Sequence, residues 1–200
     1  MLSVDGFKLR AAYELIELRD EVISLATDRN IYWKVQREVI QKNARLLTMG
    51  RAFFDMLNDS YAYATASRVR RLVDRDHRTI SLRKIVDEIG SYPELLAEKL
   101  TLEDWKCDLA RLDTTCDGVK DYVDQFVAHH DRSPTATVPT YRQLNEAIDT
   151  VIALFTRYYD ILMGTNIDVV TGYLEDPLAI FAFPLTNAAH GAIGQPGPLV

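Results

Sequence analysis

The stretch TYRQLNEAIDTVIALFTRYYDILMG, residues 140–164, decides the fold class of this chain of 200 residues. Thr140 and Gln143 have the spacing of a capping box, which begins a helix by satisfying its first free amides. Apolar residues then recur every three or four positions, at Leu144, Ile148, Val151, Phe155, Tyr158 and Ile161. Gly164 is typical of the residue that ends a helix. The pattern predicts one long amphipathic helix that buries a single face.

Similar periodicity fills most of the remaining chain. It predicts helices over about 7–27, 31–42, 49–73 and 102–126, and a short helix over 82–89 that Gly90 ends. We expect the polar residues 28–30 to separate the first two helices and Thr48 to cap the third. No stretch alternates as a half-buried strand would. The sequence therefore predicts an all-α protein, an up-and-down bundle of four to five long helices.

Composition and charge exclude several classes of protein. Hydrophobic residues make up 48% and charged residues 26% of the chain, which excludes a disordered protein. No apolar run approaches the roughly 18 residues of a membrane helix, and the first residues do not read as a signal peptide, so we expect a cytoplasmic protein without membrane association. The net charge of −6 argues against coating nucleic acid by bulk electrostatics, and no DNA partner is expected.

The end of the chain differs from the rest. We expect a helical domain over residues 1–164 and a C-terminal tail over 165–200, rich in Pro and Gly, which holds no Asp, Glu, Lys or Arg after Asp176. A tail without charge lacks what keeps disordered segments solvated. We therefore expect it to dock on the body or on a second subunit, with Ile180, Phe181 and Phe183 buried.

The cysteines and histidines predict neither a disulfide nor a metal site. Cys107 and Cys116, nine residues apart on one helix, would lie on opposite faces, so we expect reduced thiols. Of the four histidines, only His129 and His130 lie close together, in HHDR at 129–132. Neighbouring helical residues point about 100° apart and no metal-ligand spacing completes a site, so no metal or other cofactor is expected. HHDR then either complements the dipole at a helix end or belongs to a functional site.

A second candidate region is basic. Residues 68–84, RVRRLVDRDHRTISLRK, concentrate six arginines and a lysine around only two aspartates. Such a charge run is most often a solvated helix end whose arginines pair with acidic neighbours. The alternative is a local patch that binds RNA phosphates, with Arg71 and Arg75 as contacts.

The residues before HHDR resemble a known family. VKDYVDQFVAHHD at 119–131 is similar to the signature of HEPN-domain proteins, and its ending, AHHD, resembles that of their abortive-infection, AbiU-like branch. RLVD at 71–74 and TISL at 79–82 resemble a second passage of the same branch. The resemblance spans about residues 43–159, and it implies a helical core over about 43–164.

The resemblance implies a bundle that commonly dimerises, and active members that are metal-independent ribonucleases. In such a reaction an imidazole takes the proton of a ribose 2′-hydroxyl while a cation holds the phosphate. Carried over, His129 is the candidate base, His130 its neighbour, and Asp124 occupies the polar position. The family's arginine position, however, holds Val123.

Three hypotheses follow from that substitution. In the first, the protein is a degenerate member of a phage-defence or toxin–antitoxin system that binds RNA or a partner, such as an antitoxin, without cleaving. In the second, it is a working nuclease in which Arg132, Arg71 or Arg75 replaces the missing arginine. In the third, it is a structural or interaction protein, a homodimer in which AHHD only ends a helix.

Overall fold

The computed structural model describes residues 3–43, 50–96, 99–128, 135–165, 167, 169 and 176–179. Within these residues the chain is helical and contains no strand. The long helices are α1 (Val4–Val35), α3 (Arg51–Leu72), α6 (Leu102–Tyr122) and α7 (Tyr141–Met163). α1 continues into the π-helical turn η1 (Gln36–Ile40), and α6 into η2 (Val123–Ala128). The short helices α4 (Leu82–Ile89) and α5 (Pro93–Leu96) connect α3 to α6.

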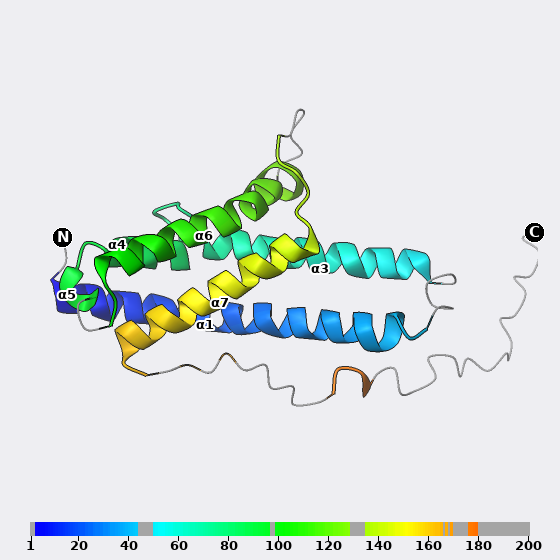
Figure 1. Cartoon of the computed structure of the whole chain (residues 1–200), viewed down its shortest axis with the longest axis horizontal. Helices are drawn as coiled ribbons and strands as arrows, with labels where there is room; N and C mark the ends of the chain where they lie inside the picture. Colours follow the sequence, from blue (N-terminus) through cyan, green and yellow to red (C-terminus); the bar gives the residue numbers. More distant parts are fainter. Residues whose placement is uncertain are drawn as a thin grey trace, which may run out of the picture.

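The four long helices form an up-and-down bundle, as predicted. Successive long helices run in opposite directions, and α7 lies across α1 (Figure 1). α7 contacts α1, α3 and α6, while α3 also packs against α1 and α6. α4 fills the end of the bundle between α1 and α6. The all-α fold class is confirmed, with four long helices.

The predicted break at residues 28–30 is wrong, because α1 runs without interruption through 32 residues. The polar residues there pair with other helices instead of ending their own. Asp28 accepts a hydrogen bond from Arg68 on α3, and Arg29 donates to Asp149 on α7. Polar residues in a long helix are tolerated where neighbouring helices supply partners, which sequence periodicity alone does not reveal.

The predicted stripe on residues 140–164 forms the centre of the core. Its members Leu144, Ile148, Val151, Phe155 and Tyr158 are buried. The predicted capping box is present at Thr140 with Gln143, and a second one, at Thr101 with Asp104, begins α6. Gly164 follows α7 with a positive φ of 70°, a conformation that glycine adopts without steric cost. The predicted cap Thr48 lies outside the described residues, and Gly50 occupies the cap position of α3.

One end of the molecule is thinner than the rest. Most of residues 31–43, in the last part of α1 and in η1, and of residues 50–58, at the start of α3, extends beyond α6 and α7, while Trp33 and Asn58 still contact α7 (Figure 1). We call these two segments the arm and the four-helix remainder the body. The arm has a separate apolar cluster, in which Val35, Ile40 and Phe54 are buried.

Only part of the expected tail is described. Asp176 forms an ion pair with Lys34 at 2.8 Å, and Leu178 packs against the apolar cluster of the arm. Ile180, Phe181 and Phe183 lie outside the described residues, so their burial stays a prediction. Both cysteines are free, as expected, with Cys116 buried and Cys107 exposed on α6. None of the helices in the described ranges combines the length and apolar character needed to cross a membrane.

Candidate functional site

The candidate motif begins where α6 changes into the π-helical turn η2. Val123 and Asp124 are the first residues of η2, which lasts to Ala128. His129, His130 and Arg132 lie outside the described residues. The ends of the segment that contains them are held together, because Gln125 Oε1 accepts hydrogen bonds from the amides of Thr135 and Ala136, at 2.7 and 2.9 Å.

The position of the family's arginine is a packing position here. Val123 is only 4% exposed and belongs to the main hydrophobic core. An uncompensated guanidinium at such a position would be costly, because a buried charge loses its hydration. The valine therefore fits its surroundings and brings no charge to the motif.

Asp124 is surrounded by two cations. Arg70 on α3 donates a hydrogen bond from Nε to Oδ1 at 2.8 Å, and Lys120, one turn earlier on α6, donates to Oδ2 at 3.0 Å. Partial burial raises the pKa of Asp124, but these hydrogen bonds outweigh it and hold the pKa below its ordinary value of 3.8. Asp124 is thus a carboxylate at neutral pH.

Arg70 is the residue that the sequence reasoning missed. Besides Asp124 it pairs at 2.6 Å with Asp74, which lies four residues later, just after the end of α3. The spacing of Arg70 and Asp74 in the sequence predicts this pair, because residues four positions apart lie on the same face of a helix. The contact to Asp124 was not readable, because it depends on how α3 packs against η2. The four side chains of Arg70, Lys120, Asp124 and Asp74, which we call the tetrad, carry no net charge.

The predicted RNA-binding residues Arg71 and Arg75 point to other partners. Arg71 forms an ion pair with Glu21 on α1. Arg75 lies 3.1 Å from Asp113 and 3.2 Å from Asp117, both on α6. The other arginines of residues 68–84 are also paired, Arg68 with Asp28, Arg78 with Asp76, and Arg83 with Asp87 and Asp113. The geometry therefore agrees with the interpretation of this stretch as a helix end with paired arginines, while RNA binding by Arg71 and Arg75 stays a prediction.

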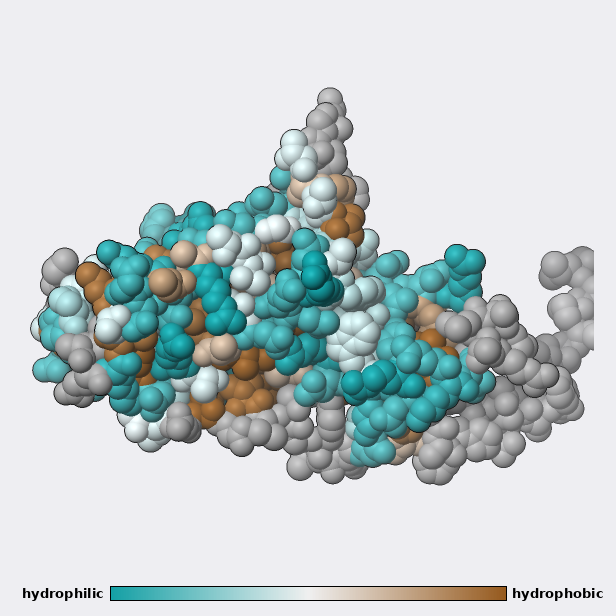
Figure 2. Space-filling model, viewed as in Figure 1, coloured by the Kyte–Doolittle hydropathy of each residue, from teal (hydrophilic) through white to brown (hydrophobic). Residues whose placement is uncertain are grey.

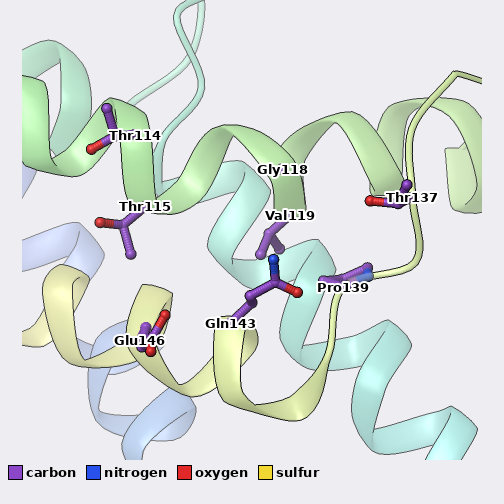
Figure 3. A pocket seen from close by; sticks show the side chains of 8 residues that line it. All are labelled: Thr114, Thr115, Gly118, Val119, Thr137, Pro139, Gln143 and Glu146. Atoms are coloured by element: carbon purple, nitrogen blue, oxygen red, sulfur yellow. The ribbon is translucent and has the colours of Figure 1, made fainter.

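A polar pocket lies beside the motif, between α6 and the start of α7 (Figure 3). Its volume is about 270 Å3, and its lining consists of Thr114, Thr115, Gly118, Val119, Thr137, Pro139, Gln143 and Glu146. Two of its polar groups are already occupied. Gln143 is engaged in the capping box of α7, and the Thr114 hydroxyl donates to the Ala110 carbonyl at 2.8 Å. The remaining polar side chains of the lining are Thr115, Thr137 and Glu146, and Glu146 lies 3.9 Å from Arg142.

A second pocket lies on the opposite side of Pro139, between α3, α6 and α7. Its volume is about 230 Å3, and its lining consists of Asp59, Ala62, Tyr63, Tyr122, Val138, Pro139, Tyr141 and Leu144. We call it the tyrosine pocket. It differs from the first pocket in being mainly aromatic and apolar.

Comparison with known proteins gives one result. No curated protein and no solved structure matched the chain significantly. The sequence model of the HEPN family described as AbiU2 matches residues 10–176, which reach from α1 to Asp176 and so extend beyond the residues that carried the resemblance. This match covers most of the chain, including all four helices of the bundle, and the protein belongs to the AbiU2 family of HEPN proteins.

Proposed function

We propose that this AbiU2-family protein acts in a bacterial phage-defence or toxin–antitoxin system by binding a partner, without cleaving RNA. One observation carries the proposal. The arginine position of the HEPN motif is a buried valine, Val123, and the two cations beside Asp124 are already neutralised in the tetrad.

The chemistry explains why that observation matters. Cleavage of a phosphodiester develops negative charge on the phosphate, and preorganised cations usually supply much of the stabilisation. Arg70 and Lys120 have carboxylate partners within 3.0 Å. A phosphate would have to compete with Asp124 and Asp74 for them and would meet the negative charge of both.

A protein partner fits the charges better than RNA does. The chain carries a net charge of −6. The one concentrated basic stretch, residues 68–84, has its arginines paired with aspartates and Glu21. RNA binding depends on cations that release counterions from the phosphates, and paired arginines contribute less to it. An antitoxin or a second copy of this chain are the partner classes that we propose.

A second function has one observation in its favour. Arg70 approaches the polar position of the motif from α3, so a guanidinium stands near the place where the family's arginine would act. If an RNA phosphate displaced Asp124, Arg70 could serve as the missing cation, a role for which the sequence suggested Arg132, Arg71 or Arg75. His129 would then be the base of a metal-independent ribonuclease.

The deciding experiment is an RNA cleavage assay. Purified full-length protein is incubated with total tRNA and with messenger RNA in the absence of divalent metal, next to the variants His129→Ala and Arg70→Ala. We expect no cleavage product from any of the three. Cleavage by the unmodified protein that disappears in His129→Ala would overturn the proposal, and its loss in Arg70→Ala as well would identify the substitute cation.

A binding assay separates the two kinds of partner. A fluorescently labelled single-stranded RNA is titrated at 50 and 200 mM salt, with Arg75→Ala as the variant and Arg51→Ala, far from the motif in the arm, as the control. We expect no affinity that depends on salt or on Arg75. Steep salt dependence would favour RNA as the partner. Light scattering tests the proposed homodimer, and a monomer at micromolar concentration would contradict it.

A further inference from the structure

The tyrosine pocket has an unusual combination of walls. Tyr63 on α3 and Tyr122 at the end of α6 face each other with ring centroids 6.4 Å apart and planes inclined by only 11°. Tyr141, the first residue of α7, forms the third aromatic wall. Tyr63 is 47% exposed and Tyr141 is 36% exposed, so both rings are accessible from solvent.

The ring of Tyr141 is held in place from behind. Tyr141 stacks on Tyr32 with centroids 5.7 Å apart, and Tyr32 stacks on the buried Tyr61 at 3.8 Å. The Tyr141 hydroxyl donates to the backbone carbonyl of Asn58 at 3.4 Å. A prearranged aromatic surface loses little conformational entropy when a ligand binds. The aromatic wall of the pocket is therefore exposed to solvent and still fixed in position.

The charge of the pocket is negative. Asp59 lies at its wall, is exposed, and has no hydrogen bond or ion pair with any residue in the described part of the chain. It differs in this from Asp124, which binds two cations. Among the residues that the structure describes, none that lines the pocket is basic. Burial raises the pKa of Tyr122 to about 12, and the neighbouring Tyr63 and the charge of Asp59 add to the effect, so the phenol is neutral at pH 7.

Several tyrosine faces beside an unpaired carboxylate favour a planar cation. A guanidinium stacks on aromatic rings through its flat face and forms hydrogen bonds to carboxylates through its edge. We propose that the tyrosine pocket binds an arginine side chain of a partner protein, with Tyr63 and Tyr141 as stacking surfaces and Asp59 as the anion. The inference rests on the proposed function in one respect, because it assumes that the partner is a protein.

An RNA base is the main competing ligand, and the pocket disfavours it. A base would stack on the same tyrosines, as bases do in proteins that bind single strands. It would also bring its phosphate close to Asp59, without a lysine or arginine in the lining to offset the charge. The aromatic rings alone would accept a guanidinium or an RNA base, and the unpaired carboxylate of Asp59 favours the guanidinium.

The test uses small probes and the full-length protein labelled for NMR. A pentapeptide with one central arginine between glycines is titrated while the aromatic and amide signals of the pocket are followed. The control probe is the same peptide with citrulline, which has the shape of arginine without its charge. Adenosine monophosphate is the probe for a base with its phosphate. We expect saturable shifts of the pocket signals for arginine, with a dissociation constant on the order of 1 mM, and binding at least fivefold weaker for the other two probes.

Matched variants assign the binding to the pocket. Asp59→Asn should weaken arginine binding about fivefold, whereas Asp55→Asn, one turn earlier on α3 and paired with Arg51, should leave it unchanged. Tyr63→Leu should also weaken binding, and the exposure of Tyr63 makes its replacement compatible with folding. The NMR spectrum of each variant verifies that the fold is retained.

Each outcome decides the inference. Equal binding of citrulline, preference for adenosine monophosphate, no shift with any probe, or equal effects of Asp59→Asn and Asp55→Asn would overturn it. The cleavage assay on His129 involves other residues, so the two proposals fail separately. RNA cleavage with intact arginine binding would refute the proposed function alone, while loss of arginine selectivity without cleavage would refute only this pocket.

Discussion

The body and the arm share two helices, α1 and α3, but these helices are packed differently in the two regions. In the body these helices pack against α6 and α7, and the resulting core includes completely buried side chains such as Leu15, Val69 and Phe155. In the arm the helices pack mainly against each other and Leu178, and they contact α7 at Tyr32, Trp33 and Asn58. Val35, Ile40 and Phe54 form the separate buried apolar cluster of the arm. The apolar face of one helix is thus buried fully or partly, depending on how many neighbouring helices cover it.

Polar contacts also connect the two helices of the arm. Asn58 accepts hydrogen bonds from the Tyr32 hydroxyl at 2.9 Å and from the Gln36 amide at 2.7 Å. Phe53 and Met56 remain more than half exposed, at 52% and 56%. The view of the molecular surface also shows hydrophobic residues in separate patches within a largely hydrophilic face (Figure 2). The difference between body and arm should therefore appear as a difference in stability.

The largest expected effect compares one phenylalanine from each region. Phe155→Ala should lower the free energy of unfolding by about 3–5 kcal/mol, because Phe155 is fully buried and the surrounding helices cannot close the cavity. Phe54→Ala should cost only about 1–2 kcal/mol, since the small cluster of the arm can collapse or admit water. Urea unfolding followed by circular dichroism measures both. Equal losses would show that the arm is as tightly packed as the body.

The next effect tests how closely the body is packed at one point. A Cβ atom added to Gly90, at the end of α4, would overlap the ring of Trp105 on α6. That ring is fixed, because its Nε1 donates to the Val86 carbonyl at 2.5 Å. Gly90→Ala should therefore destabilise the protein by about 1–3 kcal/mol, as overpacking does. An unchanged melting temperature would mean that the Trp105 ring moves aside, and it would contradict the close packing of the body at this point.

The sequence was sufficient for the fold because the body follows local rules. The caps at Thr101 and Thr140 and the stripe from Leu144 to Ile161 depend on residues a few positions apart. The prediction of a helix break at residues 28–30 was wrong because contacts with other helices determine the structure there. Arg68 and Asp149, far from this point in the chain, satisfy its polar groups. The periodicity of apolar residues describes one helix at a time and contains no information about contacts between helices.

The candidate site was less predictable for the same reason. Val123 and Asp124 could be found because they lie next to a recognisable ending of the motif, while Arg70 lies 54 residues away from the carboxylate that it contacts. Among several neighbouring arginines, only the packing of α3 against η2 selects the one that reaches Asp124. The tyrosine pocket likewise joins residues of three helices, and no local pattern connects Tyr63 to Tyr141.

A smaller effect concerns the tetrad and is visible in the pH dependence. Asp124→Asn should cost about 1 kcal/mol at pH 7, because it removes the charge that Arg70 and Lys120 share. The lowered pKa of Asp124 means that its contribution is complete above the ordinary pKa of 3.8 and is lost as the pH falls through the lower folded value. The difference between variant and unmodified protein should therefore shrink in acid. A constant difference from pH 7 to pH 2 would contradict this assignment.

The smallest effect has the opposite sign and concerns the polar pocket. Gly118 lies inside α6, and a Cβ atom added there would meet no other atom within 4 Å. Gly118→Ala should raise the free energy of unfolding by about 0.5 kcal/mol, because alanine loses less backbone freedom on folding and nothing opposes its methyl group. Thermal unfolding measures the gain, with Gly90→Ala as the contrasting glycine. If the variant is instead destabilised, the space beside Gly118 is filled by the chain itself, and the polar pocket between α6 and α7 is closed in solution.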